Sequence, residues 1–289
     1  MSERVLALLN GGLADPDAPL LPADDLGVLR GDGVFETVLV VDGVALELTA
    51  HLARLARSAA MLEFDVPDLR AWQGCAQTAI DAWDGGREMV LKLILTRGPR
   101  FGGAVTGYAM GTPVSPTLLA QRREGVAAVT LTRGTVPDVA DRAPWLLLGA
   151  KTLSYAVNMA ALRHAAQLGA QDVVFTATDG SVLEGATSTV VIAQDSTLRT
   201  PPTDLGILPG TTQAALFRAA GPAGWHTQVE PLQVADLLAA DGVWLCSSVR
   251  LITRVHTLNG HPLPDTGRTA ALRGLLPLPA ARGDRVARQ

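Results

Sequence analysis

The sequence GDGVFETVLVVDGVALEL in residues 31–48 predicts a β-hairpin that leads into a helix. Its first half is rich in β-branched side chains, and Asp42 and Gly43 form a turn before the second apolar run. Thr49 then lies where it could cap a helix, whose apolar residues recur at three- and four-residue spacing from Leu52 to Leu62. This stretch therefore predicts a mixed α/β structure for the first third of the chain.

The rest of the chain continues the mixture of helices and strands. Further helices are expected at residues 68–83, 152–168 and 234–240, and further strands at 89–96, 126–132, 172–176 and 187–193. Between residues 102 and 125 the periodicity fades and Gly, Pro, Ser and Thr accumulate, as in a connection between domains. We therefore expect an N-terminal α/β domain in residues 1–120 and a C-terminal domain in residues 121–289.

The composition argues against several classes of protein. Hydrophobic residues make up 48% of the chain, charged residues 18%, and the net charge is -4, so neither disorder nor a nucleic-acid partner is expected. Cys75 and Cys246 lie far apart and the five histidines are scattered, which argues against a disulfide framework and a metal site. Because no signal-peptide pattern and no run of about 18 apolar residues is seen, we expect a cytoplasmic protein with no membrane partner.

Lys151 is the first candidate for chemistry. The chain has only two lysines, Lys92 and Lys151, so an amine nucleophile must be one of these or the N-terminus. Lys151 follows the apolar run WLLLG at the expected start of a helix, where desolvation would favour the neutral amine that attacks an aldehyde. On position alone, a helix residue whose amine extends to water is the simpler interpretation. Lys92 lies in an apolar strand pattern and is expected to point to the opposite face or to a carboxylate.

Two later segments contain further candidates for cofactor binding. Glu184, in VLEGATSTVVI, lies between two expected strands and could pair with a protonated pyridine nitrogen, although an ordinary turn glutamate would look the same. In GILPGTT, residues Gly210, Thr211 and Thr212 lie where a loop enters a helix, and a helix N-terminus with two hydroxyls suits a phosphate group. Threonine is also a common helix cap, so this segment alone is not specific.

In order and spacing these segments resemble the class IV aminotransferases, the pyridoxal 5'-phosphate (PLP) enzymes of fold type IV. The resemblance spans nearly the whole chain, and GDGVFETVLVVDG followed by HLARLARSA (residues 51–59) carries its N-terminal part. It implies a two-domain α/β fold with an N-terminal α/β sandwich and a C-terminal pseudo-barrel with helices. It also implies a homodimer that uses pyridoxal 5'-phosphate as its cofactor and a small amino compound as its substrate.

The resemblance also implies roles for individual residues. Lys151 would form the Schiff base with the cofactor, and Glu184 would pair with its pyridine nitrogen. Tyr155, one helical turn beyond Lys151, would donate to the phenolic oxygen of the cofactor. The expected contacts around the phosphate are Arg54, Gly210, Thr211, Thr212 and Ser248, with Ser247 nearby in CSSVRLI. For Ser247, capping of a strand end is an equally good interpretation.

The resemblance leaves the reaction open between a lyase and a transaminase. We favour 4-amino-4-deoxychorismate lyase, which forms p-aminobenzoate and pyruvate, because the FET segment and the K-x-x-x-Y spacing resemble the lyases. Thr37 would then be an acid–base catalyst. The alternative is a D-amino-acid or branched-chain amino-acid aminotransferase, for which Arg97, Arg100 and Arg250 are candidates to bind a substrate carboxylate. A non-catalytic PLP-binding protein is disfavoured because the full set of expected cofactor residues is present.

Overall fold

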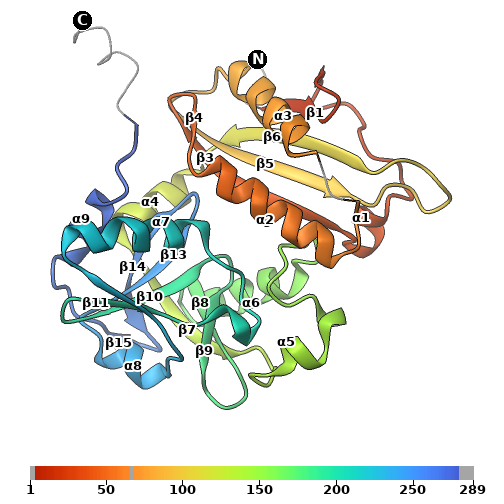
Figure 1. Cartoon of the computed structure of the whole chain (residues 1–289). Helices are drawn as coiled ribbons and strands as arrows, with labels where there is room; N and C mark the ends of the chain where they lie inside the picture. Colours follow the sequence, from red (N-terminus) through yellow and green to blue (C-terminus); the bar gives the residue numbers. More distant parts are fainter. Residues whose placement is uncertain (1–3, 66–67, 280–289) are drawn as a thin grey trace, which may run out of the picture. The chain divides into compact units, whose positions relative to one another are not determined.

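The structure, a computed structural model, describes residues 4–65 and 68–279 and divides into two compact units (Figure 1). The first unit comprises the described residues up to Ser115, the segment Ala150–Tyr155 and the residues from Leu278, and the second comprises Pro116–Gly149 and Ala156–Pro277. The segment that carries Lys151 therefore belongs to the first unit, whereas the sequence placed it in the C-terminal domain.

The first unit is built on an antiparallel sheet. Its described strands lie in the order β2 (Leu13–Ala14), β1 (Val5–Leu8), β6 (Thr106–Pro113), β5 (Glu88–Thr96), β3 (Gly33–Val41) and β4 (Val44–Ala45). β3 and β4 form the expected hairpin, and its turn residues Asp42 and Gly43 both have positive φ. β3 and β5 pair without a break from Gly33 to Val41, which fixes the face on which each side chain lies.

Helices cover one face of this sheet. They are α2 (Leu48–Met61) and α3 (Leu69–Asp81), while the short helix α1 (Leu26–Arg30) precedes β3. Glu36 of β3 contacts α2, and Val34, on the same face, lies in register across β5 with Gly107 of β6. A side chain at Gly107 would meet Trp72 of α3, so α3 covers this face as well. The expected N-terminal α/β layers are confirmed.

The second unit is built on a mixed sheet that curls on itself. Its described strands lie in the order β12 (His226–Val229), β11 (Thr197–Thr200), β10 (Thr189–Gln194), β13 (Gly242–Ser247), β14 (Leu251–Leu258), β7 (Val126–Thr132), β8 (Asp172–Thr176) and β9 (Val182–Gly185), with β15 (His261–Pro262) beside β14. Only residues 186–188 join β9 to β10, and the Gly185 N–H donates to the Ser188 carbonyl between them. The end of the sheet therefore returns to its middle, which gives the expected pseudo-barrel.

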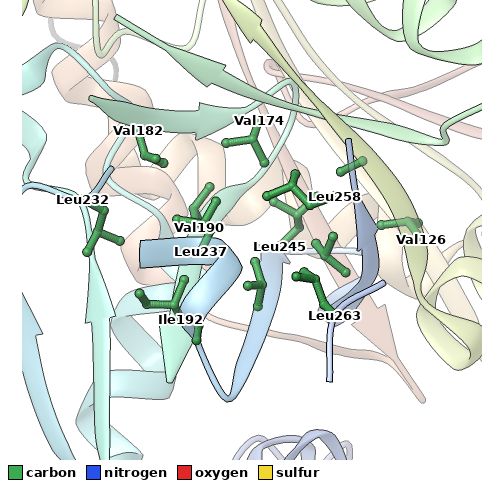
Figure 2. Close-up of a cluster of buried hydrophobic side chains, with 14 residues drawn as sticks. Val126, Val174, Val182, Val190, Ile192, Leu232, Leu237, Leu245, Leu258 and Leu263 are labelled. Carbon is green, nitrogen blue, oxygen red and sulfur yellow. The ribbon is translucent and has the colours of Figure 1, made fainter. Parts of the chain in front are cut away.

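Side chains of the curled sheet alternate between its inside and its outside. Val190 and Ile192 of β10 belong to the internal cluster drawn in Figure 2, whereas Val191 and Ala193 pack outside it. Leu237 joins the internal cluster from a helix. The helices of this unit are α4 (Pro116–Glu124), α5 (Val139–Arg142), α6 (Ala156–Gln167), α7 (Thr211–Ala220), α8 (Val234–Ala239) and α9 (Arg268–Gly274), with 3-10 turns η1 (Pro144–Leu146), η2 (Thr203–Leu205) and η3 (Gly221–Ala223).

The region expected to be a connection, residues 102–125, is instead structured. It contains β6, which pairs with both β1 and β5, and α4. Gly107 and Gly111 interrupt the apolar pattern of β6, and the structure gives the reason. An added Cβ would lie 2.7 Å from Leu9 at Gly107 and 2.4 Å from Met89 at Gly111, so neighbouring side chains pack closely against the backbone at both glycines.

Two helix starts also differ from expectation. α2 begins at Leu48 after Glu47, which has a φ of 54° and no side-chain cap, so Thr49 is not the N-cap. α6 begins at Ala156 rather than at Thr152. Among residues 4–65 and 68–279, no helix is long and apolar enough to span a bilayer, and no group of His, Cys, Asp or Glu side chains could hold a metal ion.

Candidate active site

Lys151 lies on an extended segment beside β3, not in a helix. The N–H of Phe35 donates to the Lys151 carbonyl at 3.1 Å, and the N–H of Leu153 donates to the Gly33 carbonyl at 2.8 Å. The N–H of Lys151 itself donates to Ser58 Oγ on α2 at 3.0 Å. Pairing with β3 requires extended backbone from Lys151 to Leu153, so the helix starts only after Tyr155.

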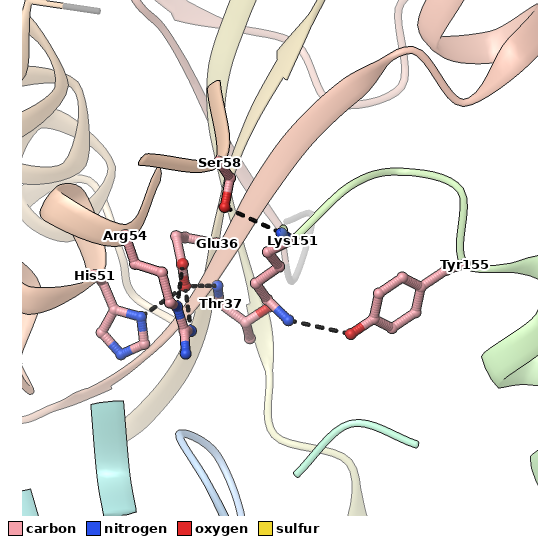
Figure 3. A network of polar contacts seen from close by, with 7 residues as sticks. All are labelled: Glu36, Thr37, His51, Arg54, Ser58, Lys151 and Tyr155. Carbon is pink, nitrogen blue, oxygen red and sulfur yellow. Dashed lines mark hydrogen bonds and ion pairs between the residues drawn. The ribbon is translucent and has the colours of Figure 1, made fainter. Parts of the chain in front are cut away.

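The amine of Lys151 lies beside two aromatic side chains, of which Figure 3 shows Tyr155. Nζ lies 3.2 Å from the Tyr155 hydroxyl and 4.4 Å from the centre of the Phe35 ring, and the lysine is 8% exposed. Phe35 and Tyr155 meet edge to face, with their centres 5.1 Å apart. Tyr155 was expected one helical turn beyond Lys151, but the chain between them is extended with a bend rather than helical. The result is a buried amine of fixed position.

A charged network lies next to this amine (Figure 3). Arg54 donates to Glu36 from Nε at 2.7 Å and from Nη2 at 2.8 Å, and His51 Nδ1 lies 2.7 Å from the same carboxylate. Burial acts to raise the pKa of Glu36, but the Arg54 charge and the hydrogen bonds from Arg54 and His51 outweigh it and hold the pKa at about 2. Glu36 is therefore ionised at neutral pH, and it holds the Nε and Nη2 edge of the Arg54 guanidinium in place.

Thr37 lies on the opposite face of β3 from Glu36, the face that also carries Phe35. It is partly exposed, and its N–H donates to Glu36 Oε2 at 3.3 Å. Its cross-strand partner is Lys92, which is exposed within a strand that is otherwise mostly buried. Lys92 thus points to the face expected for it. Lys92 belongs to the middle of β5, whereas the amine of Lys151 contacts the Tyr155 hydroxyl.

In the second unit, Glu184 lies near the end of β9 and accepts hydrogen bonds from two donors. Arg133 donates from Nη1 to Oε1 at 3.0 Å, and the N–H of Leu208 donates to Oε2 at 3.0 Å. The Arg133 guanidinium also lies 5.3 Å from the centre of the Phe175 ring. This carboxylate is therefore partly buried, paired with a cation and oriented through both oxygens.

The expected phosphate residues of the second unit gather at one end of neighbouring strands. α7 begins at Thr211 after Gly210, and Thr211 and Thr212 are both buried. An added Cβ at Gly210 would lie 2.2 Å from Thr189 Oγ1, so the start of α7 packs on the start of β10. Thr189 pairs with Cys246 at the end of β13, and Ser247 and Ser248 follow directly. The helix N-terminus and the Ser-Ser turn therefore lie at the same sheet end.

The three arginines expected at a substrate carboxylate are placed differently. Arg97 donates to Asp32 at 2.8 Å and to the Leu62 carbonyl at 2.5 Å. Arg100 is exposed and stacks near Phe101. Arg250 is buried and paired with Asp172. Arg97 and Arg250 thus already have carboxylate partners within the protein, and of the three only Arg100 is exposed to solvent.

Sequence reasoning missed several residues of this neighbourhood. Ser58, Glu36 and Arg133 contact Lys151, Arg54 and Glu184 respectively. Glu36 and Ser58 lie inside the segments that carry the family resemblance but were given no role, and Arg133 lies outside every quoted motif. Ser58 lies one helical turn after Arg54, and this spacing was the one available signal that both serve the same face of α2. Burial raises the pKa of Cys75 to about 11 and that of Cys246 to about 12, so both cysteines are inert thiols, as expected.

Comparison with known proteins agrees with this geometry. A relative from Mycobacterium tuberculosis, a bifunctional aminodeoxychorismate lyase / D-amino acid transaminase, is 49% identical over 271 residues, which cover 91% of this chain and 94% of the relative. The solved structure of a hypothetical aminotransferase from Mycobacterium tuberculosis, in its PLP-bound form, is 48% identical, with a TM-score of 0.92 over 94% of this chain and 97% of that chain.

A second solved structure supports the fold. The fold IV-transaminase CpuTA1 from Curtobacterium pusillum is 41% identical, with a TM-score of 0.91 over 96% of this chain and all of that chain (100%). The expected type IV fold is confirmed by this likeness. The family model Amino-transferase class IV matches residues 33–258. The chain therefore belongs to the class IV aminotransferase family.

Proposed function

We propose that this protein is a PLP-dependent 4-amino-4-deoxychorismate lyase that forms p-aminobenzoate and pyruvate for folate biosynthesis. The observation that carries the proposal is the similarity, over nearly the whole chain, to the bifunctional lyase and transaminase from Mycobacterium tuberculosis. The buried amine of Lys151, held at Tyr155, is the group on which such chemistry depends.

The side chains present suit PLP. An amine for the aldehyde, a carboxylate for the pyridine nitrogen, and hydroxyls at a helix N-terminus for the phosphate are provided by Lys151, Glu184 and the Gly210–Thr212 segment. In addition, the Ser188 hydroxyl, four residues after Glu184, is buried and has no hydrogen-bond partner among the described residues. A buried hydroxyl without a partner is costly, and a bound ligand at this end of the sheet would supply one.

Each of these residues has a task in the proposed reaction. When bound, PLP supplies a ring that takes up the negative charge formed at the substrate α-carbon. Lys151 Nζ accepts the proton from that carbon, and Glu184 retains the proton at the ring nitrogen. Tyr155 orients the amine. In the lyase reaction the C–O bond to the enolpyruvyl group breaks, and the Thr37 hydroxyl relays the proton taken up by Lys151 to the methylene carbon of that group, which leaves as pyruvate.

D-amino-acid transamination is a second candidate function. The printed name of the Mycobacterium tuberculosis relative combines both activities, which favours it over the branched-chain alternative. Both reactions begin with the same proton transfer to Lys151, so one site can serve both. They differ in whether the substrate loses pyruvate or exchanges its amino group with a keto acid.

The experiment that tests the function compares two assays on one purified preparation. Release of pyruvate from aminodeoxychorismate is measured beside amino transfer from D-alanine to 2-oxoglutarate. Faster pyruvate release supports the lyase, and measurable activity in both assays supports a bifunctional enzyme. Absence of both activities in protein that has bound PLP would contradict the proposal.

We further propose a cytoplasmic homodimer that acts on a small amino compound and has no nucleic-acid partner. Exposed apolar side chains on α1 and on the loop after β5 support association with a second copy, namely those of Val28, Leu29, Phe101 and Val105. Sedimentation at micromolar concentration tests the assembly, and a fully active monomer would contradict it.

A further inference from the structure

The guanidinium of Arg250 is part of a buried network in the second unit. Nη2 donates to Asp172 at 2.5 Å, and Nη1 donates to Gln121 at 3.1 Å. Arg250 is 5% exposed and Asp172 is 1% exposed. Since a buried cation paired in this way keeps its partner, Arg250 is not free to bind the carboxylate of a substrate.

Arg250 ends the turn that carries Ser247 and Ser248. Ser247, the last residue of β13, pairs with Leu251, the first residue of β14, so residues 248–250 form the turn between them. Leu251 has a φ of 56°, a conformation that side chains rarely adopt and that surrounding contacts must hold. In hairpins of this length, glycine is the usual residue at such a position.

Contacts from three sides hold this turn. Arg122 of α4 donates to the Val249 carbonyl at 2.5 Å, and Thr253 Oγ1 donates to the Arg250 carbonyl at 3.1 Å. Arg273 of α9 donates to the Ile252 carbonyl at 3.0 Å. Together with the Asp172 and Gln121 contacts, they hold residues 249–252, directly after the two serines. Such over-determined, unfavourable backbone is typical of ligand-binding segments.

The charge of Arg250 is balanced where it lies. Asp172 neutralises the guanidinium at 2.5 Å, so the pair presents little net charge to a distant anion. Any effect of Arg250 on an anion must therefore arise from the position that it gives to the turn. A lysine would keep the charge but could not reach Asp172 and Gln121 together in the fork geometry of arginine.

We propose that Arg250, through its fork to Asp172 and Gln121, is a positioning residue that holds the Ser247–Ser248 turn to receive the phosphate of PLP. The inference rests on the proposed function and on the contact of Ser248 with that phosphate that the family resemblance implies. It replaces the expected role of Arg250 as a clamp for the substrate carboxylate. Positioning matters because a hydroxyl displaced from hydrogen-bonding distance contributes nothing to phosphate binding.

The test compares two ligands that differ only in the phosphate, PLP and pyridoxal. Apoprotein is titrated with each, and binding is followed by absorbance. Arg250→Lys should weaken PLP about tenfold, the effect of losing one hydrogen bond to a charged group, while pyridoxal changes less than about twofold. Because a lysine still balances Asp172, this variant keeps the buried charges paired. The double variant Asp172→Asn with Arg250→Gln removes both charges and should give the same selective loss.

Arg199 provides the matched control. It too forms a fork in the second unit, to Glu230 at 2.5 Å and to Gln194 at 3.1 Å, but it lies on β11, away from the turn. Arg199→Lys should leave the ratio of PLP to pyridoxal affinity unchanged. Thermal unfolding of both lysine variants shows whether their losses of stability are comparable.

A double-mutant cycle with Ser248→Ala identifies the route. If Arg250 acts through the turn, Ser248→Ala should by itself lower the affinity ratio, and adding Arg250→Lys should change it little further. Equal weakening of PLP and pyridoxal, an unchanged ratio in Arg250→Lys, or full additivity with Ser248→Ala would overturn the inference while leaving PLP binding intact. Failure of the unmodified protein to bind PLP would instead overturn the proposed function.

Discussion

Arg133 donates a hydrogen bond to Glu184 across 3.0 Å, and the same carboxylate accepts a second bond from the N–H of Leu208. Each oxygen of Glu184 therefore has its own donor, so the orientation of the carboxylate is fixed through both oxygens. Arg133 follows β7 and Glu184 lies in β9. The pair exists because β7 and β9 lie on either side of β8, and the Arg133 N–H donates to the carbonyl of Thr176 at the end of β8.

The Arg133 contact leads to the first prediction. Arg133→Gln should lower kcat about tenfold in protein saturated with PLP, because Glu184 loses the charge-assisted hydrogen bond that orients one of its oxygens. Arg133→Lys should recover part of the loss, since it restores the charge without the planar guanidinium. The measurement is kcat in both assays, with PLP occupancy checked by absorbance.

Two variants frame that experiment. Glu184→Gln should reduce kcat at least as much as Arg133→Gln, since it removes the group through which Arg133 acts. Arg142→Gln alters an exposed arginine whose partner is Asp138, and it should leave kcat unchanged. Equal kcat in the unmodified protein and Arg133→Gln would remove Arg133 from the mechanism.

A second prediction concerns the lysine to which PLP is attached. Borohydride reduction of the PLP-loaded protein should place the pyridoxyl mass on the peptide that contains Lys151, because its amine is buried at Tyr155. Peptide mass spectrometry distinguishes it readily from Lys92, the only other lysine. The label should stay on Lys151 in Lys92→Ala and be lost in Lys151→Ala. A label on Lys92 in the unmodified protein would show that the site is misplaced.

The sequence predicted secondary structure correctly where that structure is set by residues close together in the chain. The turn at Asp42 and Gly43 needs positive φ at both residues, and an Asp-Gly pair is typical of such a turn. β8 lies at Asp172–Thr176, as its short apolar run predicts. The predicted helix start near Lys151 was wrong because the backbone there pairs with Gly33 and Phe35, more than a hundred residues earlier in the chain. Helical periodicity cannot reveal such pairing, which competes with the helix for the same N–H and C=O groups.

The site was predictable in its motifs and not in its supporting contacts. Lys151, Glu184 and the Gly210–Thr212 segment stand out because their residue types and order resemble a family. Arg250 was a candidate clamp for a substrate carboxylate because the planar guanidinium suits a carboxylate, and the sequence gives no sign of its internal partner. Its buried partner Asp172 lies 78 residues away, and only the register of the curled sheet brings the two together.

The third prediction follows from the ionisation of Glu36. Its pKa falls from the usual 4.5 to about 2 in the folded protein because Arg54 and His51 outweigh the effect of burial. A lowered folded pKa stabilises the fold above pH 4.5, and this stabilisation is lost as the pH falls from about 4.5 towards 2. The shift corresponds to a free energy of unfolding on the order of 3 kcal/mol at neutral pH.

Urea unfolding between pH 7 and pH 3 measures this contribution. Glu36→Gln should be less stable than the unmodified protein at pH 7, and the difference should shrink as the pH falls below 4.5. Asp138→Asn, which alters an exposed ion pair, should show almost no difference at any pH. A difference for Glu36→Gln that stays constant from pH 7 to pH 3 would mean that its charge is not the source of stability.

The fourth prediction separates the two reactions and depends on where Thr37 lies. Thr37 and Phe35 project from the same face of β3, and the Phe35 ring contacts the Lys151 amine at 4.4 Å. The Thr37 side chain therefore lies on the face of the sheet whose Phe35 ring contacts the Lys151 amine. Only the lyase reaction needs a second proton donor, because pyruvate leaves as a carbanion equivalent that must be protonated.

Thr37→Val keeps the shape of the side chain and removes the hydroxyl. On the lyase proposal it should lower p-aminobenzoate formation by about one to three orders of magnitude, the range for loss of a positioned acid–base group. Amino transfer from D-alanine should fall much less, because Lys151 alone moves the proton in that reaction. Thr37→Ser, which keeps the hydroxyl, should retain most lyase activity. If Thr37→Val forms p-aminobenzoate at the unmodified rate, or loses both activities equally, Thr37 is not the proton donor and the lyase proposal loses its acid.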